Sequence, residues 1–390
     1  MSSTEHTKYS YLLMLGHLST DINQGALLAA MPFLVLNAGF SYTAVAVLVF
    51  SSNVVSAVVQ PLFGRLGDKL SCPWIMSLGI FLAGAGMAGI GLLHSYPLII
   101  LSGMVSGFGV AMFHPEGGRL ANLCAGAQKG NGMSIFAVGG NLGFMVGPMM
   151  TASAITFFGM AGTAVFLIHS TLCAVLLLFF VSKFKSFGLV DKTSIALQEK
   201  ERWGAFGAVL AALSVRSVLF NTLLTFVPLF LVANLGQSEA FASTAITLYA
   251  LVGAFATFMS GRISARTGAQ RLLLIGMLAL VVILLSFHFC DSLLVALLLL
   301  ALAGPAVNGP YPSSVALGQS FVPRHLGMAS GLTYGVAVGV GGMLSPLMGF
   351  IGDSFGLTNV FLVGAGVALV GVILAVFLLR LTGNTVPGRS

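Results

Sequence analysis

The sequence predicts an all-α integral membrane protein whose twelve transmembrane helices form two pseudo-symmetric six-helix bundles, with both termini in the cytoplasm. Composition, a series of apolar segments and an internal repeat support this fold class. Of the 390 residues, 57% are hydrophobic and only 7% are charged, whereas an ordinary soluble domain carries about 25% charged residues. The composition therefore excludes a soluble enzyme and a disordered chain.

The twelve expected helices are apolar runs, each about as long as a tilted membrane helix needs. The first six lie at 10–36, 43–63, 73–93, 97–120, 132–156 and 161–182, and the next six at 205–232, 240–261, 271–290, 293–315, 328–350 and 357–380. The first run contains Asp21 and is followed by no signal-peptide cleavage site, so we expect it to remain as a helix. Since the number of helices is even, both termini lie on one side.

The basic residues indicate which side of the membrane is cytoplasmic. Sixteen of the seventeen occupy the termini and one alternating set of loops, and the opposite loops carry Glu239, Asp291 and Asp353 instead. The positive-inside rule places the basic loops and both termini in the cytoplasm. The net charge of +7 therefore reflects topology, and we expect no nucleic-acid partner.

The two halves of the chain resemble each other at a steady offset. Pro32 matches Pro228 after 196 positions, Gly64-Arg65 matches Gly261-Arg262 after 197, and Gly143–Pro148 matches Gly341–Pro346 after 198. Such a parallel duplication predicts two bundles related by an axis along the membrane normal, with the substrate path between them. We expect an N-terminal bundle over residues 1–182, a polar cytoplasmic linker over 183–204 and a C-terminal bundle over 205–390.

Several motifs resemble those of a known transporter family. The segment 64–69 (GRLGDK) is similar to the signature between helices 2 and 3 of the major facilitator superfamily, and Gly143, Gly147 and Pro148 are similar to its antiporter motif. The segments 113–121 (FHPEGGRLA), 134–143 (SIFAVGGNLG) and 322–332 (VPRHLGMASGL) resemble the fosmidomycin-resistance-type exporters. The resemblance implies the superfamily's fold. We expect Asp68 to cap the cytoplasmic start of the eleventh helix, where the helix dipole favours an anion, and to act in gating. The other expected gating residues are Arg65, Arg119, Gly143, Gly147 and Pro148.

One face of the first expected helix carries polar residues near its middle. His17, Asp21 and Gln24 follow the i, i+4, i+7 spacing of one helix face. A charge at the bilayer centre costs at least about 2.5–3.5 kcal/mol on insertion scales, so we expect this face to line a cavity. Asp21, helped by His17, is the predicted proton carrier; the alternative is a neutral aspartic acid bonded to a neighbouring helix.

The fourth expected helix carries further titratable residues beside Pro115. Glu116 and Arg119 form an i, i+3 pair, which predicts either a second proton carrier whose pairing breaks during the cycle or a fixed ion pair. His114 has the titration range of a proton-coupling residue. The alternative for His114 is a histidine with a structural role, whose ring nitrogens are hydrogen-bonded beside a helix kink.

Arg216 is the one basic residue outside the cytoplasmic set, about twelve residues into the seventh expected helix. A guanidinium there would bind a phosphonate or carboxylate, and the alternative is a salt bridge to Asp21 or another wall residue. The other expected substrate contacts are Gln24, Asn141, Asn221, Asn308 and Tyr311, of which the last two lie in a tenth helix broken by prolines. The glycine rows Gly139/Gly143/Gly147 and Gly331/Gly335/Gly339 have the spacing that lets helices approach closely. They predict either sliding or sealing contacts between the halves or static helix packing.

These features favour a secondary transporter over the other membrane classes. A pump would need a phosphate-binding loop and a metalloenzyme would need a ligand motif such as H-E-x-x-H, and neither motif occurs. We expect a monomer in the bacterial inner membrane, without enzyme activity, metal or cofactor, that uses protons to export a small amphiphilic or anionic compound such as an antibiotic. The alternatives are a proton-coupled importer of a small organic anion and an exporter of a siderophore or metabolite.

Overall fold

The computed structural model describes residues 3–40, 42–126, 128–187 and 201–382, and most of the expected linker therefore lies outside the described residues. Its contacts divide the chain into two units. Unit 1 consists of Met1–Glu201 with Val322–Gly335, and unit 2 consists of Arg202–Phe321 with Val336–Ser390. The all-α prediction is confirmed, because each of the twelve expected segments is mainly helical over its described residues.

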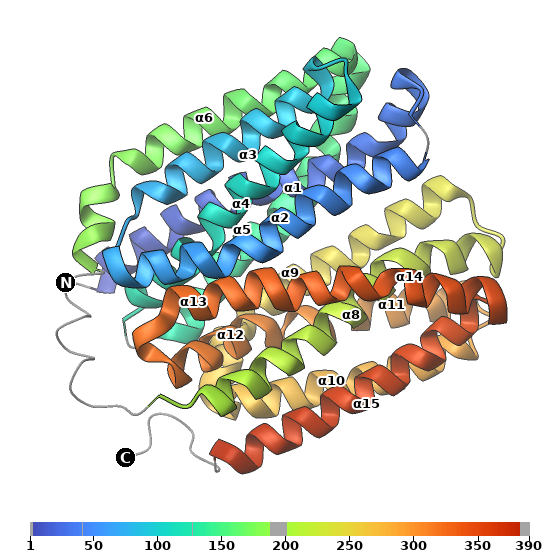
Figure 1. The fold of residues 1–390 in the computed structure, drawn as a ribbon. Coiled ribbons are helices and arrows are strands. Elements are labelled where there is room, and N and C mark those ends of the chain that lie inside the picture. Colours follow the sequence, from blue (N-terminus) through green and yellow to red (C-terminus); the bar gives the residue numbers. More distant parts are fainter. Residues whose placement is uncertain (1–2, 41, 127, 188–200, 383–390) are drawn as a thin grey trace. The chain divides into compact units, whose positions relative to one another are not determined.

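Unit 1 contains the first six long helices, coloured blue to green in Figure 1. They are α1 (Ser3–Ala38), α2 (Tyr42–Leu70), α3 (Trp74–Leu92), α4 (Tyr96–Cys124), α5 (Lys129–Phe158) and α6 (Ala164–Leu178), with the short 3-10 helix η1 (Gly159–Thr163) before α6. Helix α1 packs along α5, α3 packs against α4 and α6, and α2 packs against α4. The polar segment 64–69, expected as a loop, instead forms the last turns of α2.

Unit 2 contains α8 (Trp203–Ala233), α9 (Glu239–Thr267), α10 (Ala269–His288), α11 (Leu293–Asn308), α12 (Pro310–Phe321), α14 (Val338–Phe355) and α15 (Leu357–Thr382). Helix α8 packs against α14 and α15, α10 against α15, and α9 against α11. The tenth expected helix is broken at Gly309, between α11 and α12. This break confirms the interpretation of its prolines, because a proline removes a helix hydrogen bond.

The eleventh expected helix is assembled from several pieces. It begins with a 3-10 turn η2 (Pro323–His325) and α13 (Leu326–Gly331), continues through a π-helical segment η3 (Leu332–Ala337) and ends with α14. Helix α13 packs against α2 and α4 of unit 1. The chain therefore passes from unit 1 into unit 2 within the π-helical segment.

Ten segments of the described residues are helical, long and apolar enough to cross a membrane. One of them, Lys129–Leu178, contains both α5 and α6. Helix α1 is not among the ten, and its middle carries the polar residues that the sequence analysis assigned to a cavity.

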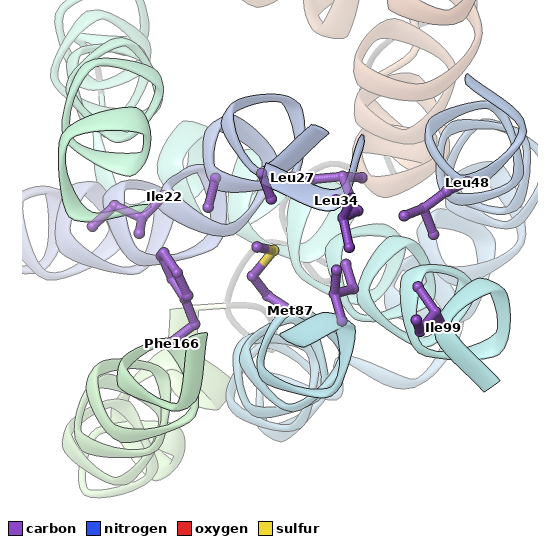
Figure 2. Packing of buried hydrophobic residues seen from close by; sticks show 10 residues of the cluster. Ile22, Leu27, Leu34, Leu48, Met87, Ile99 and Phe166 are labelled. Carbon is purple, nitrogen blue, oxygen red and sulfur yellow. The ribbon is translucent and has the colours of Figure 1, made fainter. Parts of the chain in front are cut away.

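An apolar cluster fixes the position of α1 in unit 1 (Figure 2). Ile22, Leu27 and Leu34 of α1 pack with Met87 of α3 and Phe166 of α6, and all five side chains are buried. Helix α1 also meets α5 so closely that Cβ atoms on Gly139, Gly143 and Gly147 would overlap the α1 backbone. This row therefore packs α5 on α1 within unit 1. For these three glycines the predicted contact between the halves is wrong, and the alternative of helix packing describes them.

Candidate proton site and candidate anion site

Three ionisable side chains meet between α1 and α4 in unit 1. The Asp21 carboxyl group lies 3.2 Å from His17 Nε2 and 3.1 Å from His114 Nε2, one imidazole at each oxygen. His17, Asp21 and His114 are each at most 5% exposed. The structure therefore brings together three of the four predicted proton-coupling residues, and we call them the trio.

Helix α5 also contacts the trio, in addition to α1 and α4, which carry its three residues. The Nδ1 atom of His17 lies 2.7 Å from the Phe136 carbonyl oxygen, and the two rings stack with centroids 4.1 Å apart. A Cβ atom on Gly140 would lie 2.7 Å from Asp21 Oδ2, and one on Gly143 would lie 2.7 Å from Asp21 Cβ. These glycines leave the room that the trio occupies.

An aromatic side chain from the π-helical segment of the eleventh expected helix packs against the trio. The ring of Tyr334, in η3, stacks on His114 with centroids 5.5 Å apart and meets His17 edge-on at 6.0 Å. Neither Tyr334 nor Phe136 was found by the sequence analysis. An aromatic residue in an apolar segment carries no local signal that distinguishes it from core packing.

Glu116 and Arg119 form a bidentate ion pair on α4. Arg119 Nη2 donates to Glu116 Oε1 over 2.6 Å and Nε donates to Oε2 over 2.8 Å, with both side chains buried. Arg119 also donates to the Ser71 hydroxyl group over 3.1 Å. Glu116 is therefore paired within α4 rather than with the trio among the described residues.

Asp68 caps the start of α13. Its Oδ1 accepts a hydrogen bond from Gly327 N over 2.6 Å and its Oδ2 accepts one from Met328 N over 2.9 Å. Gly64 lies so close to the Gly327 backbone that a Cβ atom would overlap it. These contacts have the geometry expected for Asp68 at a helix start, where an anion is favoured, while Arg65 is exposed.

Arg216 occupies a buried position on α8 in unit 2. Its Nε donates to the Val307 carbonyl oxygen over 3.1 Å and its Nη2 donates to Asn308 Oδ1 over 2.6 Å. The guanidinium carbon lies 4.8 Å from the Phe220 ring centroid and 4.5 Å from that of Tyr311. Among the described residues, no carboxylate lies within ion-pair distance of Arg216, and its Nη1 donates to no group.

The break between α11 and α12 explains how Arg216 reaches these partners. Val307 and Asn308 end α11, and the chain breaks at Gly309 before Pro310 begins α12. The regular helix therefore does not continue past Val307, and its carbonyl oxygen accepts from Arg216 instead. Tyr249 lies beside this group on α9, where a Cβ atom on Gly304 would overlap its carbonyl oxygen. Arg216, Asn308 and Tyr311 were separate candidates in the sequence, and in the structure Arg216 contacts both of the others.

The remaining predicted substrate contacts lie apart from these two groups. Asn221 bonds to the Ser217 carbonyl one turn earlier on α8, over 2.9 Å. Gln24 and Asn141 are half-buried on α1 and α5. Pro148 packs beside Gly25 of α1. Their proposed roles stay predictions.

The trio also has a donor set that metal ions accept. The donor atoms of His17, Asp21 and His114 lie within 4.8 Å of one another, so the absence of a linear ligand motif in the sequence did not exclude such a cluster. Both Asp21 oxygens are however within hydrogen-bond distance of an imidazole nitrogen. In the structure the trio is therefore a hydrogen-bonded cluster.

The comparison with protein families gives a match over most of the chain. A model of the Major Facilitator Superfamily matches residues 13–346, and a second match covers residues 205–389. The chain belongs to the major facilitator superfamily. It is therefore a multi-pass membrane transporter, as its apolar helices also indicate.

Relatives from this superfamily match nearly the whole length of the chain. The MFS-type transporter YfnC of Bacillus subtilis (strain 168) is 29% identical over 379 residues, covering 94% of this chain and 92% of YfnC. The fosmidomycin resistance protein of Escherichia coli (strain K12) is 26% identical over 378 residues, covering 94% and 91%. The family resemblance of the sequence motifs is confirmed by these matches.

Solved structures of superfamily members share the fold. The human organic anion transporter MFSD10 superposes with a TM-score of 0.73 at 17% identity and covers 95% of this chain and 99% of its own. The Escherichia coli fucose:proton symporter FucP gives a TM-score of 0.73 at 14% identity, covering 96% and 99%. At these identities the likeness shows the superfamily fold alone.

Proposed function

We propose that this transporter is a proton-driven exporter of a small amphiphilic or anionic compound, with its cytoplasmic termini and basic loops on the inner side of a bacterial inner membrane. The observation that carries the proposal is the buried Asp21 carboxyl group held between two imidazoles. Ionisable groups in membrane spans are expensive and mark proton relays. The name of one relative, a fosmidomycin resistance protein, favours export of a drug.

In this proposal the two units have different tasks. The trio of unit 1 binds the coupled proton, and Arg216 with Asn308 and Tyr311 in unit 2 binds the substrate's anionic group. The guanidinium has no carboxylate partner among the described residues, so an anionic substrate would neutralise it. Glu116 and Arg119 stay paired unless a second proton is taken up, and Asp68, with its contacts to α13, controls closure.

Transport into inverted membrane vesicles tests the direction and the coupling together. With an acidic interior, wild-type vesicles should accumulate a phosphonate or a lipophilic drug, and a protonophore should abolish the accumulation. Asp21→Asn should lower gradient-driven uptake at least about tenfold, because an amide neither binds nor releases the proton. Asp291→Asn, the same change at an exposed acid, should leave uptake unchanged.

Two results would contradict the proposal. Full gradient-driven uptake by Asp21→Asn would show that this residue is not the proton carrier. Accumulation only in right-side-out vesicles with an acidic exterior would show that the transporter is a proton-coupled importer of an organic anion, using the same groups in the opposite direction.

A further inference from the structure

The hydrogen bonds of His17 indicate where a proton lies in the trio. The Phe136 carbonyl oxygen can only accept, so His17 Nδ1, 2.7 Å away, must carry a hydrogen. The other nitrogen, Nε2, lies 3.2 Å from Asp21 Oδ2. If His17 were neutral and Asp21 ionised, two lone pairs would face each other across this distance. A proton therefore lies between them, on one atom or the other.

His114 accounts for the second oxygen of Asp21 without a further proton. Its Nε2 lies 3.1 Å from Asp21 Oδ1, and its Nδ1 is buried without a partner among the described residues. A neutral ring with the hydrogen on Nε2 satisfies the first contact and leaves only an acceptor unpaired. A cationic ring would instead bury an N–H group without an acceptor, which costs more.

The trio in this arrangement therefore holds one proton more than a carboxylate and two neutral imidazoles would hold. Loss of that proton leaves Asp21 Oδ2 opposite a bare nitrogen lone pair in a buried site, where repulsion is poorly screened. His17 is held by its stack on Phe136 and by the carbonyl bond. The carboxyl group of Asp21 must therefore move, and His114 loses or changes its contact with it.

Tyr334 is placed to respond to that movement. Its ring lies on His114 and touches His17 and Phe136 edge-on, with centroids 5.5, 6.0 and 6.1 Å away. It belongs to the π-helical segment 332–337, and π-type turns inside α-helices are frequent at functional sites. Within this segment the chain leaves unit 1 and enters unit 2.

The other ionisable groups around the trio do not offer an equivalent link. Helix α1 contributes His17 and Asp21, and α4 contributes His114 together with Glu116 and Arg119, which are paired with each other. Helix α5 faces the trio with the Phe136 carbonyl group and glycines. The segment 326–337 contributes Tyr334.

We propose that Tyr334 transmits the protonation state of the trio to the π-helical segment 332–337, through its ring contact with His114. The inference rests on the proposed function, because it takes the trio to be the site that binds the coupled proton. It assigns Tyr334 as a positioning residue: its ring, rather than its hydroxyl group, carries the effect. The segment is ordered on the trio when the proton is bound and loosens when the proton leaves.

Hydrogen–deuterium exchange of the purified full chain tests this link without a known substrate. Exchange is measured at about pH 5 and about pH 8, on either side of the ordinary histidine range, and corrected for the chemical rate. In the wild type, amides of 332–337 should exchange roughly tenfold faster at the higher pH, and a peptide from α10 should not change. Tyr334→Phe should keep this difference, and Tyr334→Leu and Asp21→Asn should lose it.

The outcomes separate this inference from the proposed function. A wild type without the pH-dependent difference, or a Tyr334→Leu variant that keeps all of it, would overturn the inference even if vesicle transport is proton-driven. A normal exchange pattern together with no gradient-driven transport would instead overturn the proposed function. If Tyr334→Leu does not fold, His114→Asn removes the same ring contact from the other side and must give the same loss.

Discussion

Arg216 illustrates how the environment of one residue sets what it can bind. Two of its nitrogens are used by Val307 and Asn308, and its flat faces are covered by Phe220 and Tyr311. Among the described residues, no group accepts a hydrogen bond from Nη1. This end of the guanidinium can therefore bind a ligand. A carboxylate often binds an arginine through Nε and Nη2 together, but in Arg216 these two atoms already donate to Val307 and Asn308. An anion would therefore approach the guanidinium from the side of Nη1.

Substitution of Arg216 should therefore separate anionic from neutral substrates. We expect Arg216→Gln to lower vesicle transport of an anionic substrate at least about tenfold, because a hydrogen bond to a charged group contributes about 1.5–3 kcal/mol. Transport of a neutral drug should change far less. Arg262→Gln, at an exposed position, is the control. Equal losses for neutral and anionic compounds would show that Arg216 does not bind the anion.

At the scale of elements, the trio depends on the close approach of α1 and α5. The backbone of α1 lies against Gly143 and Gly147, where a Cβ atom would meet Leu18 O, the Ile22 carbonyl or Asp21 itself. Small residues at such a seam let helix backbones meet in a membrane. The same close packing places His17 Nδ1 within 2.7 Å of the Phe136 carbonyl oxygen and so fixes the His17 tautomer on which the proposed proton site depends.

Adding a methyl group at this seam should destabilise the protein. Gly143→Ala would place Cβ 2.7 Å from both Asp21 Cβ and Leu18 O, and overpacking of this kind costs about 1–3 kcal/mol. We expect a lower midpoint of thermal unfolding in detergent and a weaker proton-driven transport. Gly366→Ala, where nothing lies within 4 Å of the added atom, should not lower the midpoint. Equal midpoints for the two variants would contradict the role of the seam.

At the scale of the whole molecule, each unit carries its own polar group inside an apolar bundle. Unit 1 holds the trio and the Glu116–Arg119 pair, and unit 2 holds Arg216. The segment 322–335 belongs to unit 1, because most of its contacts are with that unit. Asp68 and Gly64 of α2 make two of these contacts, both with Gly327. The boundary between the units therefore falls inside the eleventh expected helix rather than between helices.

The membrane orientation of the whole molecule is a prediction from its basic residues. In a cysteine-free background, Ser238→Cys should react with an impermeant maleimide in intact cells, and Lys129→Cys should react only after the cells are permeabilised. Both positions are exposed, and the positive-inside rule places Lys129 in the cytoplasm. The reverse labelling pattern would place the termini outside and would also reverse the proposed direction of transport.

How much the sequence could predict depends on the range of each interaction. His17 with Asp21 and Glu116 with Arg119 lie one helical turn apart, so their spacing alone indicated that they share a face. His114 lies 93 positions from Asp21, and Asn308 lies 92 positions from Arg216. Such pairs leave no periodic signal, which is why these residues were identified only as separate candidates.

The amino-acid sequence by itself determined the fold class, because so few charges and so many apolar residues can be satisfied only by helices in lipid. It also determined which ionisable residues lie inside those helices. Tertiary structure alone decided that two imidazoles share one carboxyl group, that Phe136 fixes a tautomer and that Tyr334 covers the trio. These contacts arise where helices distant in the chain pack together, and packing depends on the shapes of whole surfaces rather than on local spacing.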